Sequence, residues 1–428
     1  MSISERVGRT FNSLAVYNYR LFSASQLISL SGTWMQTTAQ GWLVLKITNS
    51  AVALGTVVAL QYFPIALLTL FGGALADRLP KRTVLVGTQS LAAVQALLLA
   101  ILVLTNTVQL WQIYVLALLL GTINAFDSPT RQAFVSELVG PDRLQNAIAL
   151  NSSLFNTARI VGPALAGIVI SVIGIGQAFL FNALSFIPVI AALLLLHRDE
   201  LHTSARSARE NIFHQVGDGI RYALRTPSIL IVLLALAFIG TLGYNYPIFL
   251  PLLAKFVLQA GATGLGALTS AVGVGALMGA IVMASARQAS QQRVLVAGFL
   301  FSILLMAVGL SHFLPATLLL LAAMGGAGIV YTSSSNTRLQ SLTPGPLRGR
   351  VMSLYLLLGV GTTPIGGFLV GVLSAWFGVQ LTIVLMGAGC LLGIIAVTAY
   401  ARRFGAPSTP RTVSVQSVVD ELEQDLPV

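Results

Sequence analysis

The sequence predicts an all-α polytopic membrane protein, and three observations support this fold class. Of its 428 residues, 56% are hydrophobic and only 9% are charged, against about a quarter charged in ordinary soluble chains. The apolar residues gather in twelve spans, each close to the roughly 20 residues that a helix needs to cross a bilayer. All Lys and Arg residues except Lys46, Arg159 and Lys255 lie in the termini, in the even-numbered gaps between spans, or within two residues of them. Because basic residues favour the cytoplasmic side, this spacing predicts a serpentine chain with both ends in the cytoplasm.

Each span is expected to be a helix, because a helix satisfies its own backbone hydrogen bonds within lipid. The first six spans cover residues 20–44, 52–76, 84–105, 110–130, 146–172 and 176–196. The second six cover residues 228–254, 263–285, 292–312, 315–337, 350–373 and 379–400. The chain is thus expected to divide into an N-terminal six-helix bundle at 1–196, a cytoplasmic linker at 197–227, a C-terminal six-helix bundle at 228–401 and a cytoplasmic tail at 402–428.

The linker is too rich in charge to cross a membrane, but it contains an apolar repeat. Ile212, Val216, Ile220 and Leu224 recur every four residues. This period is that of an amphipathic helix, which we expect to lie on the cytoplasmic surface.

The two halves share short segments in the same order, about two hundred residues apart. The paired segments are 84–87 with 294–297, 130–132 with 337–340, and 162–163 with 363–364. Such repetition predicts two pseudo-symmetric six-helix bundles, as in transporters with parallel internal repeats.

Composition and motifs argue against several other classes of protein. The net charge of +11 is dispersed at span ends, so no nucleic-acid partner is expected. The single Cys390 offers no disulfide framework, and the four histidines are scattered along the chain. No nucleotide-binding loop or nucleophile motif stands out. We therefore expect neither an enzyme nor a metal or cofactor site, and instead a monomer in the lipid bilayer that handles a small-molecule substrate.

The segment at 73–82, GALADRLPKR, resembles the loop signature of the major facilitator superfamily, with Pro80 where that signature usually has Gly. The resemblance covers nearly the whole chain and implies that superfamily's fold of twelve helices in two bundles. It also implies a latch, in which Asp77 docks near the start of the eleventh helix and close to Arg131 to hold the bundles in one orientation. A role in topology alone would also explain the basic residues of the segment. The implied latch residues are Gly73, Asp77, Arg78, Arg82 and Arg131.

The fifth span contains a second family-like motif. Gly162, Pro163 and Gly167 resemble a glycine-proline motif of exporters and antiporters in this superfamily, with Ala158 and Ala166 where Gly is expected. Small residues at this spacing let helices approach closely, so tight packing explains them equally well.

Three further segments are similar to siderophore and macrolide exporters of the superfamily. They are YRLF at 19–22, GTW at 32–34 and RGRV at 348–351. This similarity implies export. Many such relatives carry Asp at the position of Thr33, so this chain lacks one proton-binding carboxylate, and coupling to protons or to another ion is left open.

Arg159 lies about 13 residues into the fifth helix, which at ~1.5 Å per residue places it near the middle of the membrane. A charged side chain at that depth faces a bundle interior or a wet cavity and has a partner. Asp127 on the fourth helix is the available acid within a span. A structural ion pair and a role in binding substrate or protons are equally consistent with the pattern.

The first helix carries Gln26, Ser29, Thr33, Gln36 and Gln40 on one face, at spacings of three and four. These side chains either line a central cavity, which we favour, or hydrogen-bond to other helices as polar glue. The segment 243–247, GYNYP, predicts a break in the seventh helix, which either faces a pathway or simply kinks the packing. The other candidate cavity residues are Asn124, Asp127, Arg159, Tyr244, Asn245, Tyr331, Asn336 and Tyr355.

These features lead to one main functional hypothesis. It is a secondary active exporter of the bacterial cytoplasmic (inner) membrane, which moves an amphipathic siderophore-, macrolide- or drug-like molecule by alternating access. The alternatives are an importer of a small metabolite and a non-transporting, lipid-handling or sensory membrane protein, because fold alone does not settle function.

Overall fold

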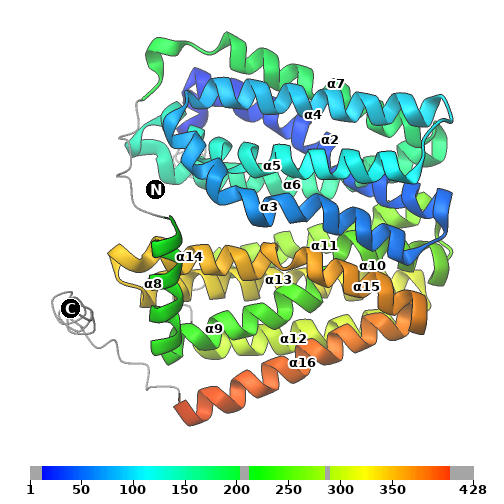
Figure 1. Cartoon of the computed structure of the whole chain (residues 1–428), viewed down its shortest axis with the longest axis vertical. Helices are drawn as coiled ribbons and strands as arrows, with labels where there is room; N and C mark the ends of the chain where they lie inside the picture. Colours follow the sequence, from blue (N-terminus) through cyan, green and yellow to red (C-terminus); the bar gives the residue numbers. More distant parts are fainter. Residues whose placement is uncertain (1–11, 203–211, 285–289, 405–428) are drawn as a thin grey trace, which may run out of the picture.

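The computed structural model describes residues 12–202, 212–284 and 290–404, and every regular element in these ranges is helical (Figure 1). The first half contains η1 (Asn12–Ala15), α2 (Tyr17–Thr48), α3 (Ala51–Arg78), α4 (Lys81–Leu104), α5 (Leu110–Val139), η2 (Pro141–Arg143), α6 (Leu144–Val172) and α7 (Ile175–Leu195). The connection to the second half contains η3 (Arg198–Glu200) and α8 (Ile212–Arg225).

The second half repeats the six-span pattern with two of its spans interrupted. Its elements are α9 (Pro227–Phe238), η4 (Ile239–Gly243), α10 (Tyr246–Leu252), η5 (Leu253–Val257), α11 (Gly261–Ala284), α12 (Gln291–Leu310), α13 (Leu314–Leu342), α14 (Gly345–Leu356), η6 (Leu357–Gly361), α15 (Thr363–Phe377) and α16 (Val379–Phe404). The elements η4, η5 and η6 are π-helical.

The predicted fold class is confirmed. Among the described residues, 11 helices are long and apolar enough to cross a membrane. The remaining predicted span is α2, a helix of 32 residues whose polar side chains lower its hydropathy. Because α2 packs against α6 and α7, it belongs to the bundle even though its composition alone does not mark it as a span.

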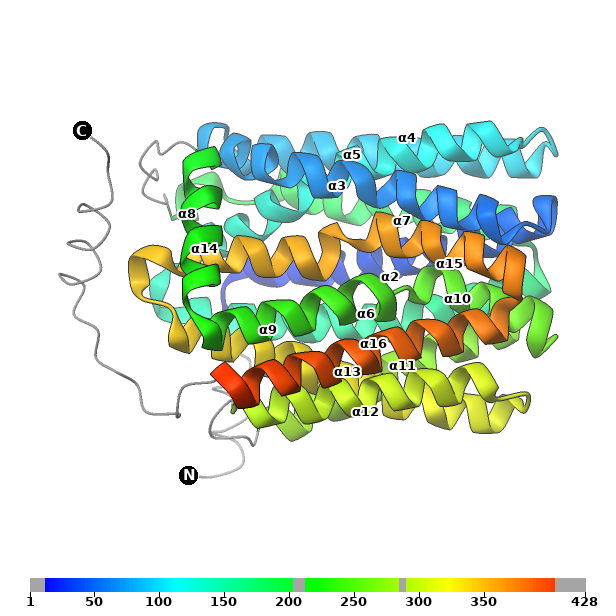
Figure 2. The same ribbon diagram turned by 60° about the horizontal axis from the view of Figure 1, so that its bottom comes forward.

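Helices pack first within each half and then across the two halves. In the first half α3 packs on α5, and α4 on α7; in the second, α11 packs on α13, and α12 on α16. The main contacts between halves are α6 with α11 and α3 with α15. Figures 1 and 2 both show α4 and α5 on one side of the molecule and α12 and α16 on the other.

The helix α8 crosses one end of the bundle, which we call the linker end. The described part of α2 begins and α16 ends at this same end (Figure 1). Ala223 of α8 is buried, whereas Ile220 and Leu224 are exposed. The side chains of Ile212 and Val216 lie outside the described part of the chain. The described apolar residues of the predicted repeat therefore point away from the protein, as they would in a helix at a membrane surface.

The opposite end, which we call the far end, is closed by close backbone contacts between the halves. A Cβ atom built on Gly371 of α15 would lie 2.8 Å from the carbonyl oxygen of Ala51 at the start of α3. A Cβ atom on Gly266 of α11 would lie 2.6 Å from the carbonyl oxygen of Pro163 in α6. Only glycine permits such close approaches, so these residues allow the helices of the two halves to touch.

The break predicted at 243–247 is confirmed, because Tyr244 and Asn245 are not helical and separate η4 from α10. The eleventh span has its own π-helical segment, η6, directly beside η4. A Cβ atom on Gly240 would lie 2.2 Å from the carbonyl oxygen of Leu358. The two irregular segments thus support each other where the second half faces the centre of the molecule.

Candidate functional site

A cavity of about 350 Å³ lies between the two halves. This volume is in the range of pockets that bind drug-sized molecules. Both bundles supply its walls: α2, α3 and α6 lie on one side, and α10, α11, α13, η6 and α15 lie on the other, together with Tyr244 just before α10. It is lined by Trp34, Thr37, Thr38, Tyr62, Arg159, Tyr244, Tyr246, Pro247, Leu250, Pro251, Leu265, Thr269, Val272, Ala276, Gly325, Gly328, Ile329, Thr332, Gly359, Val360 and Thr363.

Arg159 lies in this cavity and is held by aromatic rings. The guanidinium carbon is 5.8 Å from the ring centroid of Trp34 on α2 and 5.8 Å from that of Tyr246 on α10. Both distances fall within the range of cation–π attraction. The contact with Tyr246 joins the first half to the second. Arg159 therefore has the interior position that its depth predicts, but its partners are rings.

The suggested ion pair between Arg159 and Asp127 does not form. Asp127 instead lies 3.5 Å from Arg131, one turn further along α5. Its other carboxylate oxygen accepts hydrogen bonds of 2.8 Å from Thr88 and 2.7 Å from Gln89 on α4. These neighbouring groups satisfy the hydrogen-bonding capacity and charge of the buried carboxylate without Arg159 of α6.

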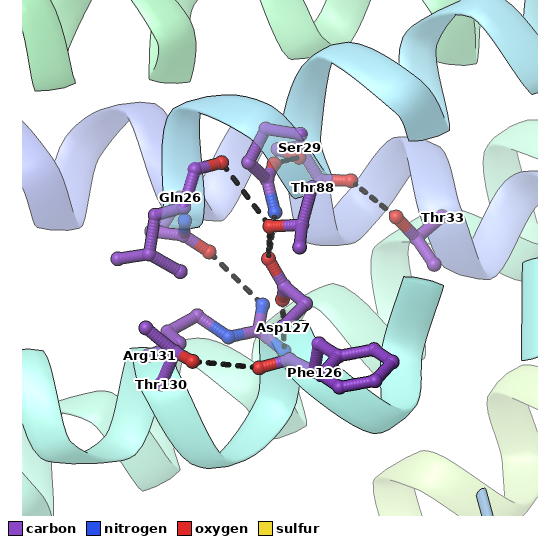
Figure 3. A network of polar contacts seen from close by, with 10 residues as sticks. Gln26, Ser29, Thr33, Thr88, Phe126, Asp127, Thr130 and Arg131 are labelled. Atoms are coloured by element: carbon purple, nitrogen blue, oxygen red, sulfur yellow. Dashed lines mark hydrogen bonds and ion pairs between the residues drawn. The ribbon is translucent and has the colours of Figure 1, made fainter. Parts of the chain in front are cut away.

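Arg131 extends this network to the first helix (Figure 3). It donates a hydrogen bond of 3.2 Å to the Oε1 atom of Gln26, which is buried on α2. Ser29, also on α2, contacts Gln89 at 3.4 Å. The network joins three helices of the first half and lies outside the lining of the central cavity.

The other glutamines of α2 also bond to neighbouring helices of the first half. Gln36 donates to Gln95 on α4 at 3.0 Å and accepts from Asn182 on α7 at 2.6 Å. Gln40 donates to Gln61 on α3 at 3.1 Å. In this structure the glutamines act as polar glue, the alternative that the sequence left open. The helix presents Trp34, Thr37 and Thr38 to the cavity instead.

A second cavity, of about 290 Å³, continues from the first towards the linker end. Thr332 lines both, and the second is otherwise lined by Ser333, Asn336, Thr337 and Tyr355. Because α13 runs from the far end to the linker end, these residues follow Thr332 in that direction. Two predicted cavity residues, Asn336 and Tyr355, thus lie along one route from the centre.

The remaining cavity candidates divide between lining and core. Tyr244 lines the central cavity, and its hydroxyl donates to the carbonyl oxygen of Gly328 at 3.2 Å. Asn245 and Tyr331 are fully buried and do not line it. Thr33 donates to the carbonyl oxygen of Ser29 within its own helix, and Asn124 is half-buried away from the cavity.

The described residues of the implied latch make contacts within the first half. Arg82 donates to the carbonyl oxygen of Leu193, and to that of Leu194 at 2.8 Å, at the end of α7. Lys81 forms an ion pair of 2.6 Å with Glu137 of α5. The side chains of the other three latch residues lie outside the described part of the chain; they are Gly73, Asp77 and Arg78.

The glycines of the fifth-span motif lie at two helix contacts. A Cβ atom on Gly162 would lie 2.5 Å from the carbonyl oxygen of Ser31 in α2. A Cβ atom on Gly167 would lie 3.1 Å from the carbonyl oxygen of Ala262 in α11. With Pro163 between them, these glycines let α6 approach both its own bundle and the opposite one.

Sequence reasoning missed the aromatic residues around Arg159 and one contact at the far end. Tyr62 gave no signal because aromatic residues are common in apolar spans, whereas Trp34 and Tyr246 lie in the GTW and GYNYP segments, which were singled out for other reasons. Lys255 of η5 donates to the carbonyl oxygen of Leu45 and, at 2.5 Å, to Asn49 Oδ1, so it joins the end of α2 to the second half. Its place in an odd-numbered gap, against the charge bias, was the available signal. Among the described residues no cluster of His, Cys, Asp and Glu could hold a metal ion.

Two six-helix bundles around a shared central cavity define a polytopic membrane transporter of the major facilitator superfamily. A family model described as a transmembrane secretion effector matches residues 9–422, and the chain belongs to that family.

Relatives of known name are similar over most of the chain. The staphyloferrin A transporter of Staphylococcus aureus is 25% identical, over 86% of this chain and 91% of its own length. The multidrug efflux pump Tap of Mycolicibacterium fortuitum is 28% identical, over 88% of this chain and 94% of its own. The structure of a bacterial homologue of the human lysosomal transporter Spinster, inward-facing and unoccupied, has a TM-score of 0.69 at 14% identity and covers 90% of this chain and 98% of its own. That likeness concerns the fold.

Proposed function

We propose that this protein is a secondary active exporter of an amphipathic small molecule in the bacterial cytoplasmic (inner) membrane. The observation that carries the proposal is the central cavity, which both bundles line and which the far-end contacts close on one side. The name of one relative, the multidrug efflux pump Tap, supports efflux over uptake.

The proposed orientation has the linker end in the cytoplasm. The charge bias of the sequence supports it, because the basic residues outside the spans gather at this end. The second cavity, lined by Asn336 and Tyr355, then leads from the cytoplasm to the centre. In this proposal, the state with the far end closed is the one that loads cargo from the cytoplasm.

Transport in this proposal follows from rocking of the two bundles about the cavity. The far-end contacts between α3 and α15 and between α6 and α11 separate, while the linker end closes. The implied latch at Asp77, Arg78 and Arg131 belongs to the linker end and stabilises one of the two states. Contacts made at glycines favour this movement, because few side chains interdigitate there and have to separate.

Flux measurements in proteoliposomes test the proposal. The purified protein should move members of a panel of siderophores, macrolides and hydrophobic drugs when an ion gradient is imposed. Failure to move any of them under any gradient would contradict it. A deletion strain distinguishes export from import. Loss of an exporter leaves cargo accumulated inside the cell, whereas loss of an importer starves the strain of a nutrient.

A reducible cross-link gives a matched test of alternating access. In the variant N49C/K255C, a thiol-reactive cross-linker joins the two halves at the far end, and the buried native Cys390 is protected from reaction. Cross-linking should stop flux and reduction should restore it. Unchanged flux in the cross-linked protein would exclude opening at the far end as a step of transport.

A further inference from the structure

The charge of the central cavity is unbalanced. Arg159 is the one charged residue among those that line it, and the others are aromatic, aliphatic, proline, glycine or threonine. Within the described part of the chain, Arg159 forms neither an ion pair nor a hydrogen bond, and its partners are the rings of Trp34 and Tyr246. The cavity is therefore a cationic site with apolar walls.

A lone cation at the depth of the membrane is costly to keep, which favours a role in function over one in packing. Ring contacts of this kind offset part of the cost without neutralising the charge. They also leave the N–H groups of the guanidinium free to donate, and these groups match the two oxygens of a carboxylate or phosphate. The cavity thus presents the complement of an anion attached to an apolar body.

We infer that Arg159 is the binding partner of an anionic group on the transported molecule, and that the cargo is an amphipathic anion with an aromatic or aliphatic body. This inference rests on the proposed function and adds the substrate's charge to it. Trp34, Tyr62, Tyr244 and Tyr246 surround the body of the cargo, while Arg159 takes its carboxylate, phosphate or phenolate oxygens. Because Tyr246 belongs to the second half, cargo bound at Arg159 contacts both moving parts.

Three fluorescent probes that differ in charge test the inference directly. They are 1-pyrenebutyrate, the neutral 1-pyrenebutanol and the cationic 1-pyrenebutylamine, with binding followed by quenching of tryptophan fluorescence in nanodiscs and corrected against empty nanodiscs. Trp34 lines the cavity and reports on it. We expect the carboxylate to bind about ten- to a hundredfold more tightly than the alcohol, and the amine to bind most weakly.

Substitutions then assign the preference to one side chain. R159Q should remove most of the preference for the carboxylate while changing binding of the alcohol about twofold or less. R159K keeps the charge but loses the planar fork, so it should keep only part of the preference. K46Q removes an exposed cation at the far end and is the matched control, which should bind all three probes as the wild type does. Size-exclusion profiles confirm that each variant is folded.

Two results would overturn the inference. The first is that the wild-type protein binds 1-pyrenebutyrate no better than 1-pyrenebutanol, or that it binds neither probe. The other is an equal loss of both probes in R159Q, which would mark Arg159 as a packing residue. The flux panel keeps the two proposals separate, because gradient-driven transport of neutral or cationic compounds with no preference for anions would leave the exporter standing and remove only its charge selectivity.

Discussion

Individual polar residues could be predicted as interior, but their partners could not. The depth of Arg159 and the period of Gln26, Gln36 and Gln40 both follow from helix geometry. Which neighbour each side chain meets depends on how the helices rotate against one another, and the sequence does not contain this information in a local form. The glutamines therefore turned out to bond helices of one bundle, whereas Arg159 lies in the cavity among rings.

Asp127 offers a test of the polar network at the level of one residue. We expect D127N to lower the free energy of unfolding by about 1–3 kcal/mol, because Thr88 and Gln89 lose a charged acceptor and Arg131 loses its ion pair. The unfolding temperature of the purified protein reports the change. It is measured by heating samples and determining the folded fraction by size-exclusion chromatography. The control is D142N, which removes an exposed carboxylate from the same half and should leave the unfolding temperature unchanged. A D127N protein as stable as D142N would show that the network contributes nothing to folding.

At the level of elements, existence and order of the helices were predictable, and their interruptions only in part. The GYNYP segment marks the break before α10, because it combines Gly, Asn and Pro within five residues. The π-helical segment at 357–361 has a weaker signal, because two of its five residues are glycine but glycine is also frequent in regular membrane helices. It packs against η4, a contact between segments more than one hundred residues apart that no local pattern in the sequence predicts. Helix α5 also extends to Val139, well past the predicted end at 130, because its last turns pack within the bundle although they are no longer apolar throughout.

The contact between the two irregular segments predicts a strong effect of a small substitution. In G240A the new methyl group would lie 2.2 Å from the carbonyl oxygen of Leu358, so η4 and η6 must move apart. We expect a loss of about 1–3 kcal/mol in the free energy of unfolding, typical of overpacking.

The matched control for G240A is G217A in α8. A Cβ atom on Gly217 meets nothing within 4 Å, and alanine is the better helix former, so this variant should be unchanged or slightly more stable. Thermal unfolding of both proteins in the same detergent makes the comparison. Equal stability of the two variants would mean that the η4–η6 contact is not as close as described.

On the scale of the whole molecule, bulk hydropathy and charge bias were enough to predict the fold. Twelve apolar spans and basic residues at alternate ends leave few topologies open, and the confirmed family and fold agree with that prediction. The closed far end could not be predicted in the same way. It depends on glycines that meet across the two halves, and glycine gives the same signal in any tightly packed membrane helix.

The contact between Lys255 and the end of α2 affects the balance between the two states of the proposed transporter. With Lys46, Lys255 breaks the charge bias, and both lie at the far end, which the proposed orientation places outside the cytoplasm. Lys46 is exposed, whereas Lys255 donates to the carbonyl oxygen of Leu45 and to Asn49, which caps α2 in the left-handed conformation. A cation at a helix C-terminus is stabilised by the exposed carbonyl groups and the helix dipole. The contact therefore stabilises the state in which the far end is closed.

Substitution of Lys255 should shift that balance. Loss of a charged hydrogen bond worth about 1–2 kcal/mol in K255Q changes the ratio of the two states by about five- to thirtyfold in favour of the open far end. Distances between spin labels placed on the two halves at the far end should show a larger fraction of long distances. K46Q removes the same charge within the last turn of α2 and should leave the distribution as in the wild type. If K255Q and K46Q gave the same distribution, Lys255 would play no part in holding the halves together, and the glycine contacts between α3 and α15 and between α6 and α11 would account for the closed far end alone.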